Sequence, residues 1–284
     1  MGSRARRQTG IERRDFLKGC AAVGIGALAG AASHGFLYER LHVEVTRATL
    51  TASGWAEGLA GLRIGFLTDL HRSETVSHEI SAAAVSLLMH ERPDLIVLGG
   101  DYVTLADPEY VEPAAEVLSG LSAPLGVFAV LGNHDDDHDM AAALNAVDIS
   151  VLRDARTQIR VRGEPLDLVG IRYWTHRVED LAKLLRGASP NVALLAHNPR
   201  RLFEAATLAV PVVISGHTHG GQVVLPGLGP IAARGFPVVA GTGKRENTSI
   251  FVSRGVGTVY LPVRLNCPPE VVILTIQTVP RLNP

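Results

Sequence analysis

Residues 212–219 read Val-Val-Ile-Ser-Gly-His-Thr-His, an apolar run that ends in a glycine and two histidines. Four other apolar runs end in polar side chains, at residues 62–68, 95–99, 127–131 and 192–196. Leucine and β-branched residues in runs of this length are typical of buried strands. The side chains that follow these runs are Asp69, His71, Asp101, Asn133, His134, Asp135, His197, His217 and His219.

Helical patterns separate these runs. Apolar residues at 80, 83, 84, 87 and 88 form the stripe of a helix that packs on a sheet. Similar patterns predict helices over residues 109–118, 139–147, 178–185 and 199–206. Residues 220–225, 249–254 and 270–277 alternate or are rich in β-formers, which predicts antiparallel strands that close a second sheet. The pattern indicates an α/β fold.

The polar residues at the strand ends are expected to converge. In open α/β sheets the ligand crevice lies beyond the carboxyl ends of the strands, and the neighbouring glycines permit sharp turns there. A single histidine in such a place is more often a hydrogen-bonded core or surface residue, but five such strand ends together favour a metal site. Cys20 and Cys267 are the only cysteines, so the ligands would be nitrogen and oxygen atoms.

Composition limits the other classes of function. The chain is 46% hydrophobic, which supports a large aliphatic core, and we expect one catalytic domain with a short N-terminal appendage. Lysine and arginine number 27 against 28 aspartate and glutamate, so the global charge gives no reason to expect nucleic-acid binding. The sequence does not determine the oligomeric state, and a monomer is compatible with it.

The N-terminus has the features of an export signal. Arg13-Arg14-Asp15-Phe16-Leu17-Lys18 precedes an apolar stretch over residues 20–32, which predicts a twin-arginine signal within residues 1–35. This stretch is about 13 residues long, shorter than a bilayer span, so we do not expect a stable transmembrane span. Both cleavage of the signal and its retention as an anchor stay open. The protein would then reach the periplasm, the cell envelope or the outer face of the membrane through the twin-arginine export machinery.

The order Asp-x-His, Gly-Asp, Gly-Asn-His-Asp, His and Gly-His-x-His resembles that of the calcineurin-like metallophosphoesterases. The resemblance covers residues 62–278. Gly216 to Gln222, Ser253-Arg254-Gly255 and Pro268-Pro269-Glu270 are similar to a bacterial branch of exported and membrane-associated phosphodiesterases that includes relatives of UDP-2,3-diacylglucosamine hydrolases. The family fold implies a four-layer αββα sandwich of two facing mixed sheets, within a catalytic domain over residues 36–284.

The resemblance also implies a role for each residue. Asp69, His71 and His219 would hold one divalent ion, and Asn133, His197 and His217 a second, with Asp101 bridging them. The donor set suits Mn²⁺, Fe²⁺ or Zn²⁺. His134 would stabilise charge or protonate the leaving oxygen, and Asp135 would orient the His134 ring. Arg254 would contact a substrate phosphate, or be a surface or salt-bridged arginine.

The predicted activity is hydrolysis of a phosphodiester or pyrophosphate bond by metal-bound hydroxide, on a membrane or envelope substrate that could be lipid-linked. Four alternatives stay open: a broad phosphomonoesterase, a UDP-2,3-diacylglucosamine-type pyrophosphatase, a metal-assisted amide or ester hydrolase, and a metal-free binding protein. The sequence contains no Ser-His-Asp elbow, P-loop or dinucleotide-binding glycine motif in the required context.

Overall fold

The first sheet contains the predicted strands that carry Asp69, Asp101 and Asn133 at their ends. In the computed structural model, which describes residues 13–280, its strands are β1 (Glu44–Ser53), β14 (Glu270–Val279), β2 (Arg63–Leu67), β3 (Leu95–Leu98), β4 (Val127–Ala129) and β5 (Ser150–Val151), in that spatial order. Strands β2 to β5 run parallel. Strand β14 is antiparallel to β2 and parallel to β1.

The second sheet contains the predicted strands that precede His197 and His217. Its order is β12 (Gly241–Arg245), β13 (Thr248–Val252), β9 (Val212–Ser215), β8 (Val192–Leu195), β7 (Glu164–Gly170) and β6 (Ala155–Val161). The four central strands are parallel, and the two outer strands are antiparallel to their neighbours. A separate small hairpin pairs β10 (Val224–Leu225) with β11 (Gly229–Pro230).

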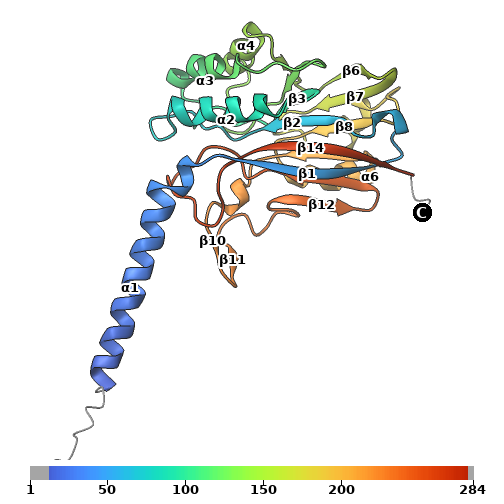
Figure 1. Cartoon of the computed structure of the whole chain (residues 1–284). Helices are drawn as coiled ribbons and strands as arrows, with labels where there is room; N and C mark the ends of the chain where they lie inside the picture. Colours follow the sequence, from blue (N-terminus) through green and yellow to red (C-terminus); the bar gives the residue numbers. More distant parts are fainter. Residues whose placement is uncertain (1–12, 281–284) are drawn as a thin grey trace, which may run out of the picture.

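Three apolar clusters separate four layers (Figure 1). The central cluster lies between the two sheets and contains Phe66, Phe128 and Phe251. Helices α2 (His78–His90), α3 (Val111–Leu118) and α4 (Asp139–Ala146) cover the first sheet, and α5 (Val178–Leu184) and α6 (Leu202–Thr207) cover the second. The predicted α/β fold with two facing mixed sheets is therefore confirmed.

Short 3₁₀ helices complete the fold. They are η1 (Glu39–Leu41), η2 (Glu57–Leu59), η3 (Pro108–Tyr110), η4 (Pro199–Arg201) and η5 (His219–Gly221). The predicted helices over 109–118 and 199–206 each begin as 3₁₀ turns, with Pro108 and Pro199 at their first positions, where a missing backbone N–H leaves no hydrogen bond unmade.

Two predictions for the C-terminal part are wrong. Residues 270–277 were expected in the second sheet, but β14 lies inside the first, where Val272 and Leu274 face the other sheet and Val271 and Ile273 face the helices. Residues 220–225 were expected to be a strand, but only Val224–Leu225 is extended. Gly220 and Gly221, at φ 61° and 82°, turn the chain before that point.

Helix α1 (Arg13–Leu37) extends away from the two sheets (Figure 1). Its apolar part is longer than we expected, because the helix continues past residue 32. Residues Phe16–Leu41 form a 26-residue segment with the length and composition of a membrane span. Only 6% of its most apolar part is buried inside the protein. The length argument against a span therefore fails. Residues 1–12 of the predicted signal lie outside the described part of the chain.

Candidate metal centre

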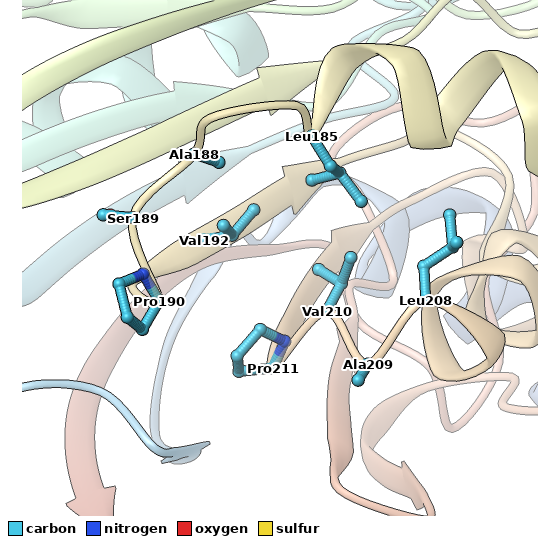
Figure 2. A pocket seen from close by; sticks show the side chains of 9 residues that line it. All are labelled: Leu185, Ala188, Ser189, Pro190, Val192, Leu208, Ala209, Val210 and Pro211. Carbon is cyan, nitrogen blue, oxygen red and sulfur yellow. The ribbon is translucent and has the colours of Figure 1, made fainter.

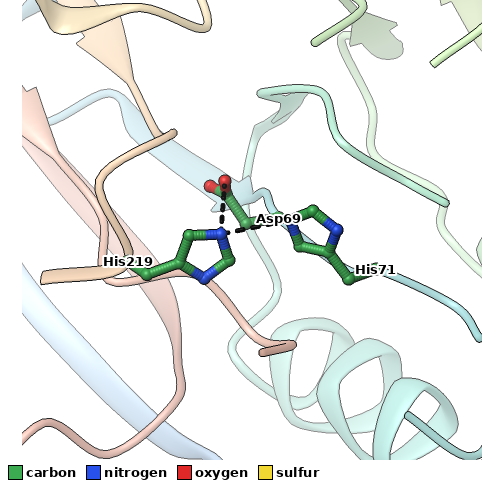
Figure 3. Close-up of side chains that lie close together, drawn as sticks. All are labelled: Asp69, His71 and His219. Carbon is green, nitrogen blue, oxygen red and sulfur yellow. Dashed lines mark hydrogen bonds and ion pairs between the residues drawn. The ribbon is translucent and has the colours of Figure 1, made fainter. Parts of the chain in front are cut away.

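The first cluster joins the end of β2 to the loop after β9. Asp69, His71 and His219 are buried, and their side chains point toward one another (Figure 3). The Nε2 atoms of His71 and His219 lie 3.1 Å apart, and His219 Nε2 lies 3.4 Å from the Asp69 carboxylate. One carboxylate and two imidazoles, whose ligand atoms all lie within 4.8 Å of one another, can surround a metal ion.

The second cluster consists of Asp101, His197 and His217, from the loops after β3, β8 and β9. His197 Nε2 lies 3.1 Å from Asp101 Oδ2 and 3.1 Å from His217 Nδ1. His197 Nδ1 lies 2.8 Å from the Gly99 carbonyl, which can only accept, so this nitrogen carries the hydrogen. The other ring nitrogen of His197 is thereby directed at the cluster.

Asp101 lies between the two clusters. Its Oδ2 atom is 3.1 Å from His197 Nε2 and 3.6 Å from His71 Nε2, so one carboxylate oxygen approaches an imidazole of each cluster. Its other oxygen accepts the backbone N–H of His134 at 2.8 Å. This hydrogen bond fixes the orientation of the carboxylate, as a bridging ligand requires.

The backbone of the site is bent in a way that strand ends rarely show. Five of the seven predicted ligands have positive φ, namely Asp69 (54°), His71 (50°), Asp101 (56°), His217 (74°) and His219 (51°). This conformation costs a residue with a side chain about 1 kcal/mol or more, and such costs concentrate at functional sites. The bends bring side chains from the ends of both sheets together in one site.

Two glycines keep space free beside the carboxylates. A Cβ atom on Gly132 would lie 2.0 Å from Asp101 Oδ1, and one on Gly216 would lie 2.2 Å from Asp69 Oδ2. Real Cβ atoms essentially never approach so closely. The glycines of Gly-Asn-His-Asp and Gly-His-Thr-His are therefore needed because any side chain would displace a carboxylate of the site.

Burial and charge set the protonation of the histidines. Burial lowers the pKa of His71 to about 4 and that of His217 to about 3, and it lowers the pKa of His219 well below its usual value. Neutral imidazole is the form that binds metals. Burial opposes the charge of His197 as well, but the Asp101 carboxylate raises the pKa of His197 to about 9. Without metal, His197 is therefore protonated at neutral pH.

The pKa values of the two carboxyl groups, Asp69 and Asp101, are shifted in opposite directions. Burial raises the pKa of Asp69 to about 6. Burial also disfavours the charge of Asp101, but the charge of His197 and its hydrogen bond hold the pKa of Asp101 below its usual range. Asp101 and His197 thus form a buried ion pair.

Asn133 supports the fit of a metal to this site. Its side-chain oxygen is buried and has no hydrogen-bond partner among the described residues, a state that costs free energy unless a ligand satisfies it. Its neighbours Gly132 and His134 both adjoin the Asp101 carboxylate. An amide oxygen together with the two imidazoles and the one carboxylate of the second cluster suits a borderline divalent ion, so the residues present fit the predicted cofactor.

The ring of His134 is held by the backbone rather than by a carboxylate. Its Nδ1 atom accepts the N–H of Leu105 at 3.0 Å, so Nδ1 carries no hydrogen and Nε2 carries it. The ring packs edge-on against His71, with centroids 5.0 Å apart. His134 therefore presents an N–H donor beside the first cluster.

Asp135 lies elsewhere than we expected. Its carboxylate accepts the backbone N–H groups of Asp101 (2.7 Å), Tyr102 (2.8 Å) and Gly132 (2.8 Å). The structure shows no hydrogen bond from Asp135 to the His134 ring within residues 13–280. The prediction that Asp135 orients this ring was wrong, because the Asp135 carboxylate and the His134 ring have different hydrogen-bond partners. Asp135 instead fixes the loop that carries Asp101.

Arg254 is engaged in an ion pair. Its guanidinium contacts Glu270, with Nη2 2.7 Å from the carboxylate and Nε at 3.0 Å. This geometry agrees with the expected alternative that Arg254 is a salt-bridged arginine. It gives no support to a contact between Arg254 and a substrate phosphate.

Other residues around the site were not predicted. Tyr173 and Phe236 lie beside His217, with ring centroids 5.4 and 5.2 Å away, and Tyr260 lies 6.2 Å from the His134 ring. Tyr173 follows β7. Because the sequence did not lead us to predict this strand, we did not expect Tyr173 to lie at a strand end. Arg264 is fully buried and donates to the carbonyls of Arg254, Gly255 and Gly257. No sequence motif marks Arg264.

One pocket lies away from this chemistry. A pocket of about 310 Å³ is lined by Leu185, Ala188, Pro190, Val192 and neighbouring residues (Figure 2). It lies at the amino ends of β8 and β9, opposite to the ends that carry His197 and His217. Ser189 is its only hydroxyl, and no titratable side chain lines it. It has none of the groups that hydrolysis requires.

Comparison with known proteins agrees with the fold and the site. Residues 62–221 match the model of the calcineurin-like phosphoesterase family, and the chain belongs to this family. It is therefore a hydrolase of a metal-dependent family.

Three relatives illustrate the range of the family. The chain is 32% identical to phosphodiesterase YaeI of Escherichia coli (strain K12), over 93% of this chain and 98% of the relative. It is 29% identical to the uncharacterized metallophosphoesterase YkuE of Bacillus subtilis (strain 168), over 94% and 98%. It is 25% identical to UDP-2,3-diacylglucosamine pyrophosphatase LpxG of Chlamydia trachomatis, over 82% and 90%.

Proposed function

We propose that the chain hydrolyses a phosphodiester or pyrophosphate bond of a lipid-linked or other envelope substrate. The observation that carries this proposal is the joining of two ligand clusters by one carboxylate, Asp101, with the N–H of His134 beside them. Such a pair of clusters suits in-line displacement at phosphorus.

The residues divide between two metal positions. Asp69, His71 and His219 would hold one ion and Asn133, His197 and His217 the other, with Asp101 shared. Mn²⁺, Fe²⁺ and Zn²⁺ all suit these donors. When bound, two such ions supply Lewis-acid stabilisation of negative oxygens and lower the pKa of water.

The protein's own part in the reaction is to position charge. His134 donates from Nε2 toward an oxygen of the phosphoryl group or the leaving group, since Leu105 occupies its Nδ1. This arrangement favours stabilisation of negative charge over transfer of a proton, because a ring that lost its Nε2 hydrogen would be an imidazolate. Tyr173 and Phe236 border the open side of the second cluster near the half-buried His217.

The substrate class rests on relatives and location. YaeI is named a phosphodiesterase and LpxG a pyrophosphatase of a diacylated sugar nucleotide. Helix α1 would place this chain at a membrane, where substrates with lipid tails are available.

A comparison of three substrates tests the proposal. The purified, Mn²⁺-loaded chain should show higher kcat/KM for a bis-aryl phosphate and a lipid-linked pyrophosphate than for an aryl monophosphate. A tenfold preference for the monophosphate, about 1.4 kcal/mol of transition-state discrimination, would replace this proposal by a phosphomonoesterase. Failure to cleave any phosphoester, together with failure to bind the metal, would favour the metal-free binding protein.

Export by the twin-arginine route is part of the proposal. Changing both Arg13 and Arg14 to Lys should keep the protein from the outer face of the membrane, because the export receptor reads paired guanidinium groups. Fractionation and protease protection of cells that express the full chain measure the location. Export of the double variant at the normal level would exclude this route.

A further inference from the structure

Large apolar side chains remain exposed on two loops beside the metal centre. Leu228 and Ile231 belong to the β10–β11 hairpin and are 69% and 55% exposed, while Tyr260 and Leu261, on the loop between β13 and β14, are 81% and 69% exposed. We call these four residues the apolar rim. A single exposed leucine is ordinary, but four large apolar residues on adjoining loops mark an interaction surface.

Gln222 ties the two loops together. Its side-chain oxygen accepts the N–H of Val259 at 2.7 Å, and its side-chain nitrogen donates to the carbonyls of Val259 and Leu261 at 3.2 and 3.4 Å. Its neighbour Val223 accepts the N–H of Ile231 at 2.9 Å. The hairpin and the loop therefore share one base, and the rim forms one surface.

The same base is bonded to the end of α1. Leu265 donates its N–H to Gln222 and accepts from Val224, both at 2.9 Å. One residue earlier, the N–H of Arg264 bonds the carbonyl of Gly35 at 3.2 Å, near the last turn of α1. Figure 1 shows that α1 and the hairpin extend from the body toward the same side.

Glu39 strengthens this connection. The side chain of Glu39 is buried, and its carboxylate accepts the backbone N–H groups of Asn266 and Cys267. A carboxylate that accepts two backbone N–H groups holds its segment firmly to the loop it binds. The end of α1 is thus part of the catalytic domain's packing, and the position of α1 relative to the rim is fixed.

The rim is also next to the reaction site. The Tyr260 ring lies 6.2 Å from that of His134, and Gln222 follows directly on η5, which begins at His219. Any surface that meets the rim therefore lies beside the metal centre.

We propose that the apolar rim docks on the lipid bilayer that α1 crosses, so that a lipid-linked phosphoester reaches the metal centre without leaving the membrane. The lipid-linked substrate in this statement rests on the proposed function; the docking does not. Arg234 donates to the carbonyls of Leu228 and Pro230, which places a guanidinium beside the apolar hairpin, where lipid phosphates would meet it. Arg13 and Arg14 at the other end of α1 suit the cytoplasmic face.

A spin label measures the docking without any substrate. In a Cys20→Ser background, where buried Cys267 is protected from labelling, Leu228→Cys carries a nitroxide in the full chain reconstituted in phosphatidylglycerol–phosphatidylcholine vesicles. We expect the label to be accessible to oxygen and shielded from a water-soluble nickel complex. A nitroxide at Phe203→Cys, on α6 and 41% exposed, serves as the control and should show the reverse.

Three results would overturn the docking. Equal nickel accessibility of the two labels in vesicles would show that the rim is in water. Shielding of the Leu228 label in detergent without vesicles, increasing with protein concentration, would show that a second copy of the chain covers the rim. Shielding by vesicles of the Phe203 label alone would place the α6 face, and not the rim, on the membrane.

Turnover provides the second test. The double variant Leu228→Ser/Ile231→Ser should raise KM for a lipid-linked pyrophosphate in vesicles by about tenfold or more, since burial of two large apolar side chains is lost. Its kcat/KM for a water-soluble bis-aryl phosphate should stay unchanged, and Phe203→Ser should change neither. An equal loss on both substrates would contradict docking. If the unaltered chain cleaves no lipid-linked substrate although the Leu228 label is shielded, the substrate proposal fails and the docking stands.

Discussion

The two ligand clusters differ in burial and in protonation. All three residues of the first cluster, Asp69, His71 and His219, are buried, and burial keeps both imidazoles neutral. In the second cluster His217 is half-buried, and the ion pair with Asp101 keeps His197 protonated. The first cluster is thus ready for a cation, whereas the second must lose a proton first. Similar donor sets can therefore bind metal with different dependence on pH.

The largest expected effect comes from Asp101, which is shared by both clusters. Asp101→Asn should lower kcat/KM by about 10³-fold or more, because the charge that serves both ions is lost. Elemental analysis should show less metal at both positions. The matched variant Asp69→Asn should lose chiefly one ion per chain. Two ions and normal turnover in Asp101→Asn would show that this carboxylate does not join the clusters.

His134 is expected to act beside the first cluster without holding metal. His134→Gln should keep the metal content and lower kcat by about 10²- to 10³-fold, the range for loss of one charge-stabilising donor. The loss should be similar for aryl leaving groups of different pKa, because Leu105 fixes the ring as a hydrogen-bond donor. His138→Gln, an exposed histidine nearby, should have no effect. A loss that shrinks with better leaving groups would assign proton transfer to His134 instead.

The sequence predicted the parts of the fold that burial determines. Runs such as 95–99 and 212–215 are apolar on both faces, and the structure shows β3 and β9 there. The outer strands β1 and β6 were missed because exposed and partly buried side chains alternate in them without a clear apolar face. The sheet to which β14 belongs was not predictable either, since a strand buried on both faces fits the interior of either sheet.

The candidate site likewise has features that the sequence predicted and features that it did not. The side chains at strand ends converge as expected, because parallel strands present their carboxyl ends at one edge. The task of Asp135 depends instead on how the loops after β3 and β4 meet, which the chain order does not specify. The metal-binding roles of the converging residues remain predictions that the variants above address.

A smaller effect is expected from Asp135, which supports only the loop of Asp101. Asp135→Asn replaces an acceptor of four backbone N–H groups by an amide whose own hydrogens would face some of them. Metal binding should weaken at both positions, which share Asp101, by about 10- to 100-fold, the range for supporting residues of metal ligands, and excess metal should restore turnover. Asp136→Asn is the matched control, because Asp136 accepts two backbone N–H groups of an exposed turn.

An unchanged affinity in Asp135→Asn would mean that the loop holds its shape through its other contacts. A loss of turnover that excess metal does not restore would point to a direct part in the reaction.

The smallest effect tests the difference in protonation itself. His197 has a raised pKa of about 9 in the metal-free protein, so its proton is present below pH 9 and opposes binding of a cation. Metal affinity at the second cluster should therefore rise by about fivefold between pH 8 and 9 and level off above about pH 10. Burial holds the pKa of His71 at about 4, and the pKa of Asp69 is about 6, so affinity at the first cluster should be flat in this window.

Calorimetric titration with Mn²⁺ at pH 8, in buffers of different ionisation enthalpy, counts the protons released. At this pH Asp135, whose pKa burial raises to about 7, is already mostly ionised and contributes little. We expect about one proton released with one of the two ions and none with the other. Single-ligand variants then assign the events: His219→Gln should remove the event without a proton, and His217→Gln the event with one. Equal proton release with both ions would mean that the two clusters do not differ in protonation, and that the Asp101–His197 ion pair is not the state from which metal binds.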